Sequence, residues 1–513
     1  MFVFDFSLVF KFLTALFFVL LGHYAFVRPH LLLAPYKKLK HVHVLIKGRI
    51  LPSFGKMKKD VITKGDFYHE WREVVLRDPE SRAYVTVNGR ILTIYLIDPE
   101  LIKVYFQQHD FYEKRLGVGL MKLFLQDGLF SAEGDVWKKH RKIDSQAFHF
   151  DFVSSQISLI RKISKEFIGK IDPAEKLSAI NFFQSITGEI VCQAFFGSNL
   201  ARQATGGKSF CILLAELMVD LVAEVQTPMH MLFRMTYVKN CPNRKVKELI
   251  RRMEEFKKVC RDIVTDRKER MRKGELLETE TSDLLYLLLK YQSNNSEESL
   301  SDDEIVHEFI TFFLAGMDTT GHLLGMSTYY IAKTPGVKEK LMEEMKEIWS
   351  VQENEITTDI LNKMEYTQAV FNETFRLATP APATATRAAK KDHMIGDIPV
   401  RRRDAVVPAF LMNFSNPRWF DNPLEFRPDR WRSATGKVTS SHPKNPFIFI
   451  PFSAGQRNCI GQYMALVEAK IILSEFMKEF DFEVPADYTL KMDRNFLYEP
   501  YEELKLVIRR RSK

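Results

Sequence analysis

The sequence of 513 residues predicts a mainly α-helical protein with a minor β portion, preceded by one N-terminal transmembrane helix. Three observations predict this class: residues 12–27 are nearly all apolar, a hairpin pattern stands at Asn88–Gly89, and helical periodicity dominates the chain after Pro99. Apolar residues make up 46% of the chain and charged residues 27%, so a large buried core is possible and global disorder is excluded.

The N-terminal segment has the composition of a membrane anchor. Residues 12–27 are nearly all apolar, and with residues 2–10 they approach the length of about 20 residues that crosses a bilayer. The next charges are basic: Arg28, Lys37, Lys38 and Lys40. Because basic flanks stay in the cytosol, the N-terminus is expected to face the lumen. A cleaved signal peptide is the alternative, but neither a basic start nor a small-residue cleavage site is clear. We expect an anchor at 1–27, a basic linker at 28–59 and one large domain at 60–513.

The remaining elements follow from local patterns. Two alternating segments flank Asn88–Gly89, a turn dipeptide that tolerates positive φ, and predict strands at 82–87 and 90–95. Asp98 and Pro99 are typical of a helix start. Longer helices are expected at 245–273, 305–332, 335–350, 357–377 and 462–480, with a cap-like Ser301 before the second, and short strands at 395–410.

Charge and cysteine usage limit the classes of partner. The formal net charge of +9 suits an anionic membrane surface or an acidic protein partner. The chain has no zinc-finger spacing, RNA-binding signature or arginine-rich arm, so no nucleic-acid partner is expected. The five cysteines are far apart, which favours a reducing compartment over a disulfide scaffold. The 13 histidines show no metal-binding spacing, and His140, His149 and His322 are expected to be surface or core residues.

The most informative position is Cys459, in the segment Phe452-Ser-Ala-Gly-Gln-Arg457-Asn-Cys459-Ile-Gly461. A lone cysteine on a glycine-bearing loop before a helix is a place to hold a thiolate, because the positive helix end and nearby Arg457 both favour the ionised sulfur. Such a thiolate is a nucleophile or a metal ligand, and a buried structural cysteine is a third alternative. No general base is visible in the sequence neighbourhood of Cys459.

The pattern Phe-x-x-Gly-x-Arg-x-Cys-x-Gly is specific, since its five fixed residues would meet by chance about once in 10 million positions. It resembles the haem-binding loop of the cytochrome P-450 family, the haem-thiolate monooxygenases. The resemblance implies that Cys459 is the axial ligand of the haem iron and that Arg457 contacts a haem propionate. It also places Phe452 and Gly461 in the haem-binding loop, and the cofactor it implies is haem b, iron protoporphyrin IX.

A second motif lies inside the expected helix 305–332, at Ala315-Gly-Met-Asp318-Thr319-Thr320. Glycine is a poor helix former, and threonine hydroxyls can bond to carbonyls one turn earlier and help to open a helix. We therefore expect a local opening where a small ligand or water can sit, and a kink packed in the core is the alternative. The segment resembles the oxygen-activating helix of the same family, which implies that Thr319 hydrogen-bonds the bound oxygen and that Asp318 relays protons.

A charge triad resembles the same family. Glu373 and Arg376 are three residues apart, which makes them neighbours on one helix face. With Arg430 they resemble the family's triad, which implies a structural role in holding the haem pocket. The family usually has Pro-Glu-Arg-Phe where this chain has Pro428-Asp-Arg-Trp431.

Three further residues resemble contacts to the haem propionates. Trp137 and Arg141 are one helical turn apart, and their indole and guanidinium groups are suitable donors to an anion. Arg387 resembles a third propionate contact, and an ordinary surface arginine is the alternative for it.

The resemblance covers about residue 60 to the end and implies the cytochrome P-450 fold. It implies insertion of one oxygen atom from O2 into a lipophilic organic substrate. No flavin or nicotinamide motif is visible, so electrons are expected from an NADPH-dependent flavoprotein reductase, with cytochrome b5 as a further candidate donor. Lys138, Lys139 and Lys142 are candidates for docking it. The implied location is the endoplasmic reticulum membrane, single-pass, with the catalytic domain facing the cytosol.

Three alternatives stay open. One is a haem-thiolate isomerase or dehydratase that rearranges peroxides without external electrons, against which the intact Asp318–Thr319 pair argues. The others are a non-catalytic haem sensor or carrier, and a membrane-anchored scaffold without haem. The substrate is not specified by the sequence; its pocket is expected to draw on residues 116–130, 210–233, 309–315, 381–386 and 496–498.

Overall fold

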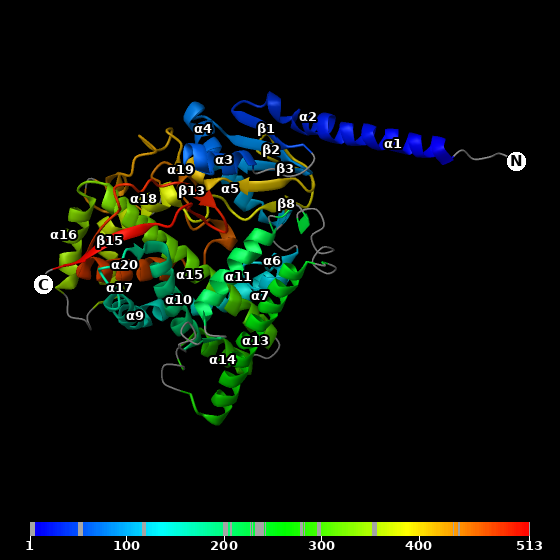
Figure 1. Ribbon diagram of the computed structural model, residues 1–513. Coiled ribbons are helices and arrows are strands. Elements are labelled where there is room, and N and C mark those ends of the chain that lie inside the picture. The colour runs from blue at the N-terminus through cyan, green and yellow to red at the C-terminus, as the bar shows by residue number, and fades with distance from the viewer. Residues whose placement is uncertain are drawn as a thin grey trace. The chain divides into compact units, whose positions relative to one another are not determined.

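The computed structural model describes residues 6–49, 55–114, 119–197, 204–205, 208–225, 227, 229–230, 241, 243–276, 281, 283–294, 299–350, 356–433, 435–439 and 442–511. The described residues are mainly helical with small sheets, which confirms the predicted fold class (Figure 1). Contacts divide the chain into two compact units. Unit 1 comprises Met1–Arg115, Ala383–Pro423 and Lys444–Phe449, and unit 2 comprises Leu116–Pro382, Leu424–Pro443 and Ile450–Lys513.

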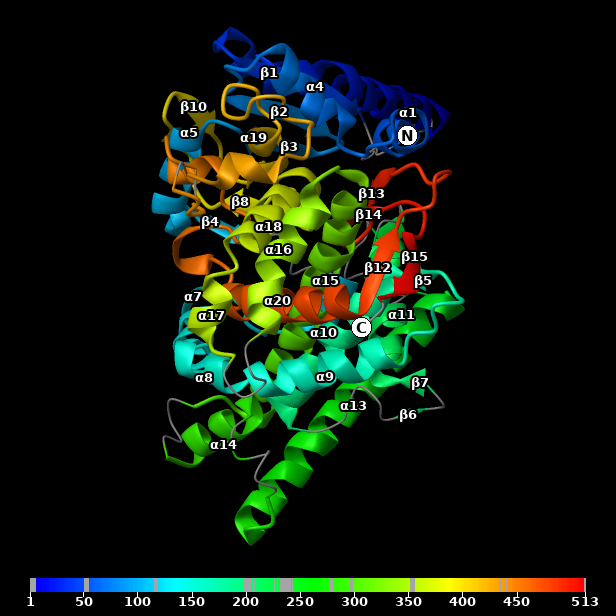
Figure 2. The same ribbon diagram turned by 90° about the vertical axis from the view of Figure 1, so that its left-hand side faces the viewer.

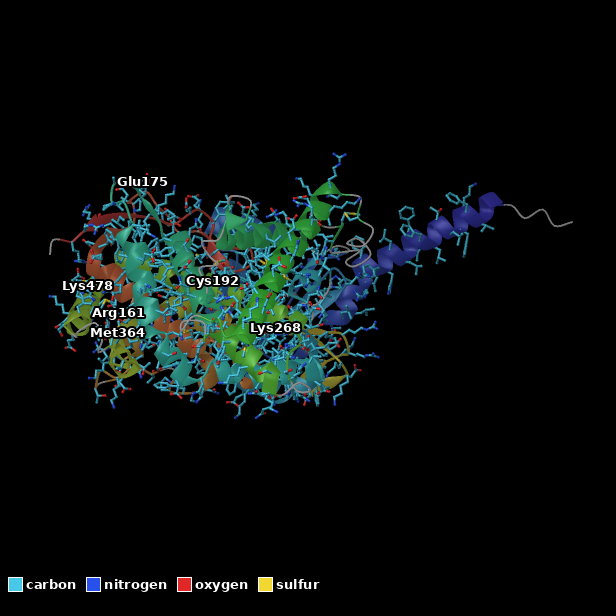
Figure 3. The ribbon with its side chains drawn as sticks, turned by 90° about the horizontal axis from the view of Figure 1, so that it is seen from below. Arg161, Glu175, Cys192, Lys268, Met364 and Lys478 are labelled. Atoms are coloured by element: carbon cyan, nitrogen blue, oxygen red, sulfur yellow. The ribbon has the colours of Figure 1, made fainter. Side chains whose placement is uncertain are left out.

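Unit 1 begins with an unbroken helical segment made of α1 (Phe6–Gly22), a π-helical turn (His23–Val27) and α2 (Arg28–Leu33). Within it, Val9–Leu33 is long and apolar enough to cross a membrane by length and composition. Large apolar side chains of α1 are exposed and project from the helix on both sides (Figure 3). The segment is consistent with a membrane anchor and continues past the expected end at residue 27.

A six-stranded sheet lies in unit 1, in the order β1-β2-β3-β11-β8-β4. Its strands are β1 (Val42–Gly48), β2 (Ala83–Asn88), β3 (Ile91–Leu96), β4 (Tyr112–Lys114), β8 (Arg387–Ala389) and β11 (Ala405–Pro408). The predicted hairpin is confirmed: β2 and β3 are antiparallel, with Gly89 in the turn at φ 62°. β1 lies within the segment 28–59 that was expected to be a linker, and it pairs in parallel with β2.

The other elements of unit 1 are short. They are η2 (Tyr36–Lys38), α3 (Gly55–Lys64), α4 (His69–Arg77), α5 (Pro99–Gln107), η3 (His109–Phe111), β9 (His393–Ile395), β10 (Ile398–Val400), α19 (Phe410–Phe414) and η8 (Pro446–Ile448). The predicted start of α5 is confirmed, because the Asp98 carboxylate accepts the N–H groups of Glu100 and Leu101.

Unit 2 is mainly helical (Figure 2). Its helices are α6 (Leu120–Leu125), α7 (Gly134–Ala147), α8 (Phe150–Ser155), α9 (Ile157–Gly169), α10 (Ala179–Phe196), α11 (Phe210–Val225), α13 (Arg244–Lys273), α14 (Leu284–Asn294), α15 (Asp302–Lys333), α16 (Val337–Trp349), α17 (Thr358–Asn362), α18 (Glu365–Ala378) and α20 (Gln462–Glu479), with 3-10 turns η7 (Pro428–Trp431) and η9 (Gly455–Arg457). Its small sheets join β12 (Phe480–Glu483), β15 (Lys505–Arg510) and β5 (Leu177–Ser178), β13 (Met492–Arg494) and β14 (Tyr498–Pro500), and β6 (Ala204–Thr205) and β7 (Lys208–Ser209).

Most helices expected in this part of the chain are confirmed, but the single helix expected at 357–377 is wrong. The chain turns between α17 and α18, and the Glu344 carboxylate from α16 accepts the N–H groups of Tyr366 and Thr367 at 2.5 and 2.8 Å. A partner from a distant helix therefore caps α18, which no local pattern reveals. By contrast, α15 begins at the expected Ser301, which forms a capping box with Glu304.

Helix α15 packs against α10, α13, α18 and α20 in unit 2. Its closest neighbour is α10, because glycines of α15 let the two backbones approach. A Cβ atom on Gly321 would lie 2.7 Å from the backbone nitrogen of Gln184 and 2.8 Å from its Cα. Helix α20 is held to α9 by the buried pair Arg161–Glu475, with Nε and Oε1 2.9 Å apart (Arg161 is labelled in Figure 3).

Replacing Gly321 with alanine is expected to destabilise unit 2 by about 1–3 kcal/mol, because the new methyl group would meet backbone atoms of α10 that cannot rotate away. The measurement is the free energy of unfolding by denaturant. Gly169→Ala is the matched control, since a Cβ there would have no atom within 4 Å, and we expect it to be neutral or stabilising. Equal stabilities of the two variants would contradict the close packing of α10 on α15.

Candidate functional site

The loop that carries Cys459 is closed by its own backbone. The N–H of Cys459 donates to the carbonyl of Phe452 at 2.9 Å, and the turn between them places Ser453 and Gly455 at φ 63° and 71°. The N–H of Gly461, at the start of α20, donates to the Cys459 sulfur. The loop therefore presents one sulfur atom at a helix N-terminus, as expected from the sequence.

The Cys459 side chain is exposed, yet protein surrounds its sulfur. Its side chain has free surface, yet burial raises the pKa of the thiol, while the Gly461 N–H and the Arg141 guanidinium lower it. Neither of these groups is a base that could take the thiol proton. The chemistry of this donor therefore fits a metal ligand, because a bound cation supplies the charge that favours the thiolate.

The cationic neighbour of the sulfur differs from the expected one. Arg141 of α7 acts on the thiol, and its guanidinium donates to the backbone carbonyl and side-chain oxygen of Asn458 at 3.0 and 2.7 Å. Arg457, which the sequence suggested for this role, instead donates to the Ala132 carbonyl at 2.8 Å and lies 3.4 Å from a Glu133 oxygen. The physical reason is that the Arg457 guanidinium binds the Ala132 carbonyl and the Glu133 carboxylate, which lie just before α7.

Trp137 and Arg457 are brought together, with the guanidinium carbon 4.2 Å from the indole ring centre. Trp137, Arg141 and Arg457 thus surround the Cys459 loop with indole and guanidinium donors. Such donors suit an anionic group such as a propionate. Arg387 belongs to β8 of unit 1, and its role as a third propionate contact stays a prediction.

Helix α7 is fixed to α15 through His140, a buried residue whose part sequence reasoning missed. Its Nδ1 lies 2.5 Å from an oxygen of Glu308 and its Nε2 lies 3.2 Å from an oxygen of Glu304. Burial lowers the pKa of His140, but the two glutamates outweigh it and raise this pKa above its ordinary value. The contact orients the helix that bears Trp137 and Arg141.

Helix α15 stays α-helical through the second motif, so the expected local opening is absent. The Thr319 hydroxyl does bond back as expected, donating to the Ala315 carbonyl at 2.8 Å, without breaking the helix. Ala315 is exposed, whereas Leu314 and Met317 beside it are buried. The exposed point of this motif is therefore a small side chain on an intact helix rather than an unwound turn.

Asp318 lies on the same helical turn, and its carboxyl group has an unusually high pKa. Burial raises its pKa to about 7, and the charge of Glu499 on β14 adds to the rise. Its Oδ1 accepts a hydrogen bond of 3.3 Å from the Gln184 amide of α10. A carboxyl group with a pKa near neutrality can both hold and release a proton at cellular pH.

The raised pKa of Asp318 predicts a pH dependence of stability. The folded chain keeps this proton up to about pH 7, whereas the unfolded chain releases it near the ordinary pKa of 3.8. The folded state binds the extra proton between these values, so the contribution is full below pH 3.8 and is lost as pH rises to about 7. Asp318→Asn should therefore gain stability over the wild type by up to about 1.4 kcal/mol per pH unit across this window.

Denaturant unfolding at several pH values measures this difference. Asp487→Asn, which changes an exposed aspartate, is the matched control and should follow the wild type at each pH. Parallel stability curves for Asp318→Asn and the wild type would contradict the raised pKa of the Asp318 carboxyl.

The structure brings Glu373, Arg376 and Arg430 together in the interior of unit 2. Glu373 and Arg376 are fully buried and form two hydrogen bonds of 2.8 Å, and Arg430 Nε donates to Glu373 Oε1 at 2.9 Å. The Trp431 indole N–H also donates to Glu373, at 2.9 Å. Trp431 is a partner that the sequence reading missed, although a buried indole N–H generally needs an acceptor.

This buried charge cluster connects to the cysteine loop through aromatic rings. Phe375 of α18 lies next to Phe452 of the loop, with ring centres 5.1 Å apart in an edge-on arrangement. The helix that carries Glu373 therefore supports the start of the Cys459 loop. Of the expected pocket segments, Phe309 and Phe313 are fully buried core residues, and residues 116–118, 226, 228 and 231–233 lie outside the described residues.

Taken together, these residues fit a haem: an exposed thiol surrounded by protein, indole and guanidinium donors around its loop, and an exposed small side chain on α15. The model of the family described as Cytochrome P450 matches residues 83–505.

Relatives of known name point to the same family. The chain is 29% identical to secologanin synthase 1 of Catharanthus roseus, over 80% of this chain and 77% of that protein. It is 29% identical to cytochrome P450 72A13 of Arabidopsis thaliana, over 80% of this chain and 78% of that protein. A crystal structure of the cytochrome P450DA haem domain, 21% identical, has the same fold, with a TM-score of 0.72 over 87% of this chain and 93% of that one. The chain therefore belongs to the cytochrome P450 family of haem-binding monooxygenases.

Proposed function

We propose that this chain inserts one atom of O2 into a lipophilic organic substrate, with haem b as its cofactor and an NADPH-dependent flavoprotein reductase as its electron donor. The overall reaction consumes substrate, O2, NADPH and one proton, and yields hydroxylated product, water and NADP+. The observation that carries the proposal is the Cys459 sulfur, which accepts from the Gly461 N–H and lies next to Arg141; among the described groups that act on its pKa there is no base.

The proposed cofactor contacts follow from the residues around that sulfur. Cys459 would ligate the iron, while Gly461 donates to the sulfur and Phe452 packs in the loop. Trp137, Arg141, Arg457 and Arg387 would hold the propionates. When bound, haem supplies the redox-active iron at which O2 is activated, and a thiolate ligand favours O–O cleavage. Glu373, Arg376 and Arg430 support the loop indirectly. They fix α18, whose Phe375 packs against Phe452 at the start of the loop.

The proposed proton path uses α15. Cleavage of O2 to water consumes two protons for each pair of electrons, so a donor must reach the site. With a pKa of about 7, Asp318 can hold and release a proton near neutral pH, and the Thr319 hydroxyl, one residue on, would direct that proton toward oxygen.

Thr319→Ala is expected to divert reducing equivalents from product to hydrogen peroxide, lowering the ratio of product to NADPH consumed by about tenfold or more, because oxygen loses its positioned proton donor. The measurement is product, peroxide and NADPH in the same reaction. Thr328→Ala is the matched control, since that hydroxyl makes a similar back-bond of 2.7 Å to Gly325 in the buried part of α15. Tight coupling in Thr319→Ala would contradict the assignment.

We further propose the domain arrangement and location. Residues 1–27 anchor the chain in the endoplasmic reticulum membrane, residues 28–59 follow it, and residues 60–513 form the catalytic domain on the cytosolic side. The support is the apolar helix and the basic residues that follow it. Lys138, Lys139 and Lys142 stay the proposed docking residues for the reductase or for cytochrome b5; Lys138 also pairs with Asp135 at 3.0 Å and Lys139 with Glu304 at 2.9 Å.

The test of the proposed function is a labelled turnover. Lipophilic compounds that shift the haem absorbance of the purified chain are incubated with a flavoprotein reductase, NADPH and 18O2. We expect product that carries one heavy oxygen atom and that depends on the reductase. Conversion of an organic hydroperoxide without NADPH would instead support the isomerase or dehydratase alternative. Ligand binding without any product would support a haem carrier.

A further inference from the structure

The turn of α15 that carries Asp318 is hydrogen-bonded to two side chains of α10. The two helices pack along each other in unit 2 (Figure 2). The Gln184 amide donates to Asp318 Oδ1 at 3.3 Å, and the Thr187 hydroxyl donates to the Met317 carbonyl at 2.7 Å. Gln184 and Thr187 are three residues apart on α10, so they lie on one face and reach two consecutive residues of α15.

The closeness of this contact is built into the sequence of α15. Gly321 follows Asp318 by three residues, and any side chain there would strike Gln184. The absence of a Cβ atom lets α10 approach until a short amide side chain reaches the carboxyl. Thr187 is fully buried, so its hydrogen bond to the Met317 carbonyl is shielded from water.

The side chain that hydrogen-bonds the Asp318 carboxyl is neutral, so a neutral group sets its orientation. From α10, the neutral Gln184 amide contacts Asp318, and the neutral Thr187 hydroxyl contacts the neighbouring Met317 carbonyl. From β14, Glu499 is the charged group whose field reaches it, and Asn495 donates to Glu499 at 2.9 Å. On α15 itself, His322 lies one turn on, and burial lowers its pKa to about 4, so it stays neutral. No cation from the described residues is among the groups that raise or lower the pKa of Asp318.

We infer that Gln184 and Thr187 are positioning residues for Asp318: they fix the carboxyl on α15 so that its proton is delivered in one direction. The inference rests on the proposed function, because it assigns the supports of the acid that serves the oxygen site. Gln184 binds Oδ1, which leaves Oδ2 to carry the transferable proton. Thr187 holds the Met317 carbonyl and so fixes the backbone from which Asp318 projects.

The test compares conservative variants in the holoenzyme. Gln184→Met removes the amide donor at similar length, Thr187→Val removes the hydroxyl at similar shape, and Thr187→Ser restores the hydroxyl. Ser185→Ala, next to Gln184 but exposed on α10, is the matched control. We expect Gln184→Met and Thr187→Val to lower the ratio of product to NADPH by about threefold to tenfold, the factor that one hydrogen bond supplies. Thr187→Ser and Ser185→Ala should keep wild-type coupling.

A second readout does not depend on turnover. The infrared carbonyl band of the protonated Asp318 carboxyl is identified as the band that Asp318→Asn removes. In Gln184→Met this band should shift and titrate at higher pH, because an N–H donor that favours the ionised form is lost. Wild-type coupling in both Gln184→Met and Thr187→Val, or reduced coupling with an unchanged carboxyl band, would overturn the inference.

These outcomes are separate from a failure of the proposed function. If the wild-type chain gives no reductase-dependent product, the proposed function falls and this inference falls with it. If the wild type is active and coupled while the variants match it, the inference alone is overturned. Should Thr187→Val fold poorly, Gln184→Met decides the question, because Gln184 is half-buried and its side chain can be changed without emptying a core position.

Discussion

Glu373→Gln is expected to lower the free energy of unfolding by about 3–5 kcal/mol, a large part of the 5–15 kcal/mol that holds an ordinary domain together. The carboxylate of Glu373 is fully buried and accepts from Arg376, Arg430, the Trp431 indole and the Arg427 N–H. Burial raises the pKa of Glu373, yet Arg376 and Arg430 bring it below its ordinary value, so the group is ionised. The amide would leave two buried guanidinium groups without a compensating charge. Yield of soluble protein and the denaturant midpoint measure the loss.

Two further variants calibrate this expectation. Trp431→Phe removes a single donor to Glu373 and should cost about 1–3 kcal/mol, less than the loss of the charge. Glu483→Gln breaks an exposed pair with Arg509, 2.9 Å apart on the surface, and should cost about 1 kcal/mol or less. A Glu373→Gln chain that unfolds at the same denaturant concentration as Glu483→Gln would contradict the structural role of the cluster.

Cys459→Ser is expected to abolish product formation and the thiolate-type spectrum while leaving the chain folded. The hydroxyl is similar in shape, and the bond that closes the loop runs from the backbone N–H of Cys459 to Phe452, so it is retained. A serine hydroxyl does not replace a thiolate as an electron-donating ligand of haem iron. Circular dichroism reports the fold, and absorbance with turnover reports the ligand.

Cys241→Ala is the matched control for this substitution. Cys241 is a free, buried cysteine remote from the loop in sequence, and its variant should keep both spectrum and activity. Product formation by Cys459→Ser at the wild-type rate would exclude Cys459 as the ligand.

Features set by neighbouring residues were predictable from the sequence. The hairpin at Asn88–Gly89, the cap of α15 at Ser301 and the start of α20 after the cysteine loop depend on turn and capping residues that lie within a few positions. The pair Glu373–Arg376 is likewise local, because residues three apart meet on a helix.

Features set by distant residues were not predictable. β1 was missed because its pairing with β2 decides the structure of a segment that reads as basic and irregular. The break before α18 depends on Glu344 from another helix. The cation that acts on the thiol is Arg141, which lies more than 300 residues before the loop in the sequence. The sequence alone favoured Arg457, because Arg457 is only two residues from Cys459. Gln184 and Thr187 carry no sequence signal, since only the packing of α10 on α15 brings them to Asp318.

The central claim is that Cys459 binds haem iron as a thiolate, and the reduced carbon monoxide difference spectrum of the purified wild-type chain tests it most directly. We predict the long-wavelength Soret band that a thiolate ligand produces, in an amount equal to the haem bound. A spectrum of the type given by a histidine ligand, or no haem absorbance at all, would contradict the account.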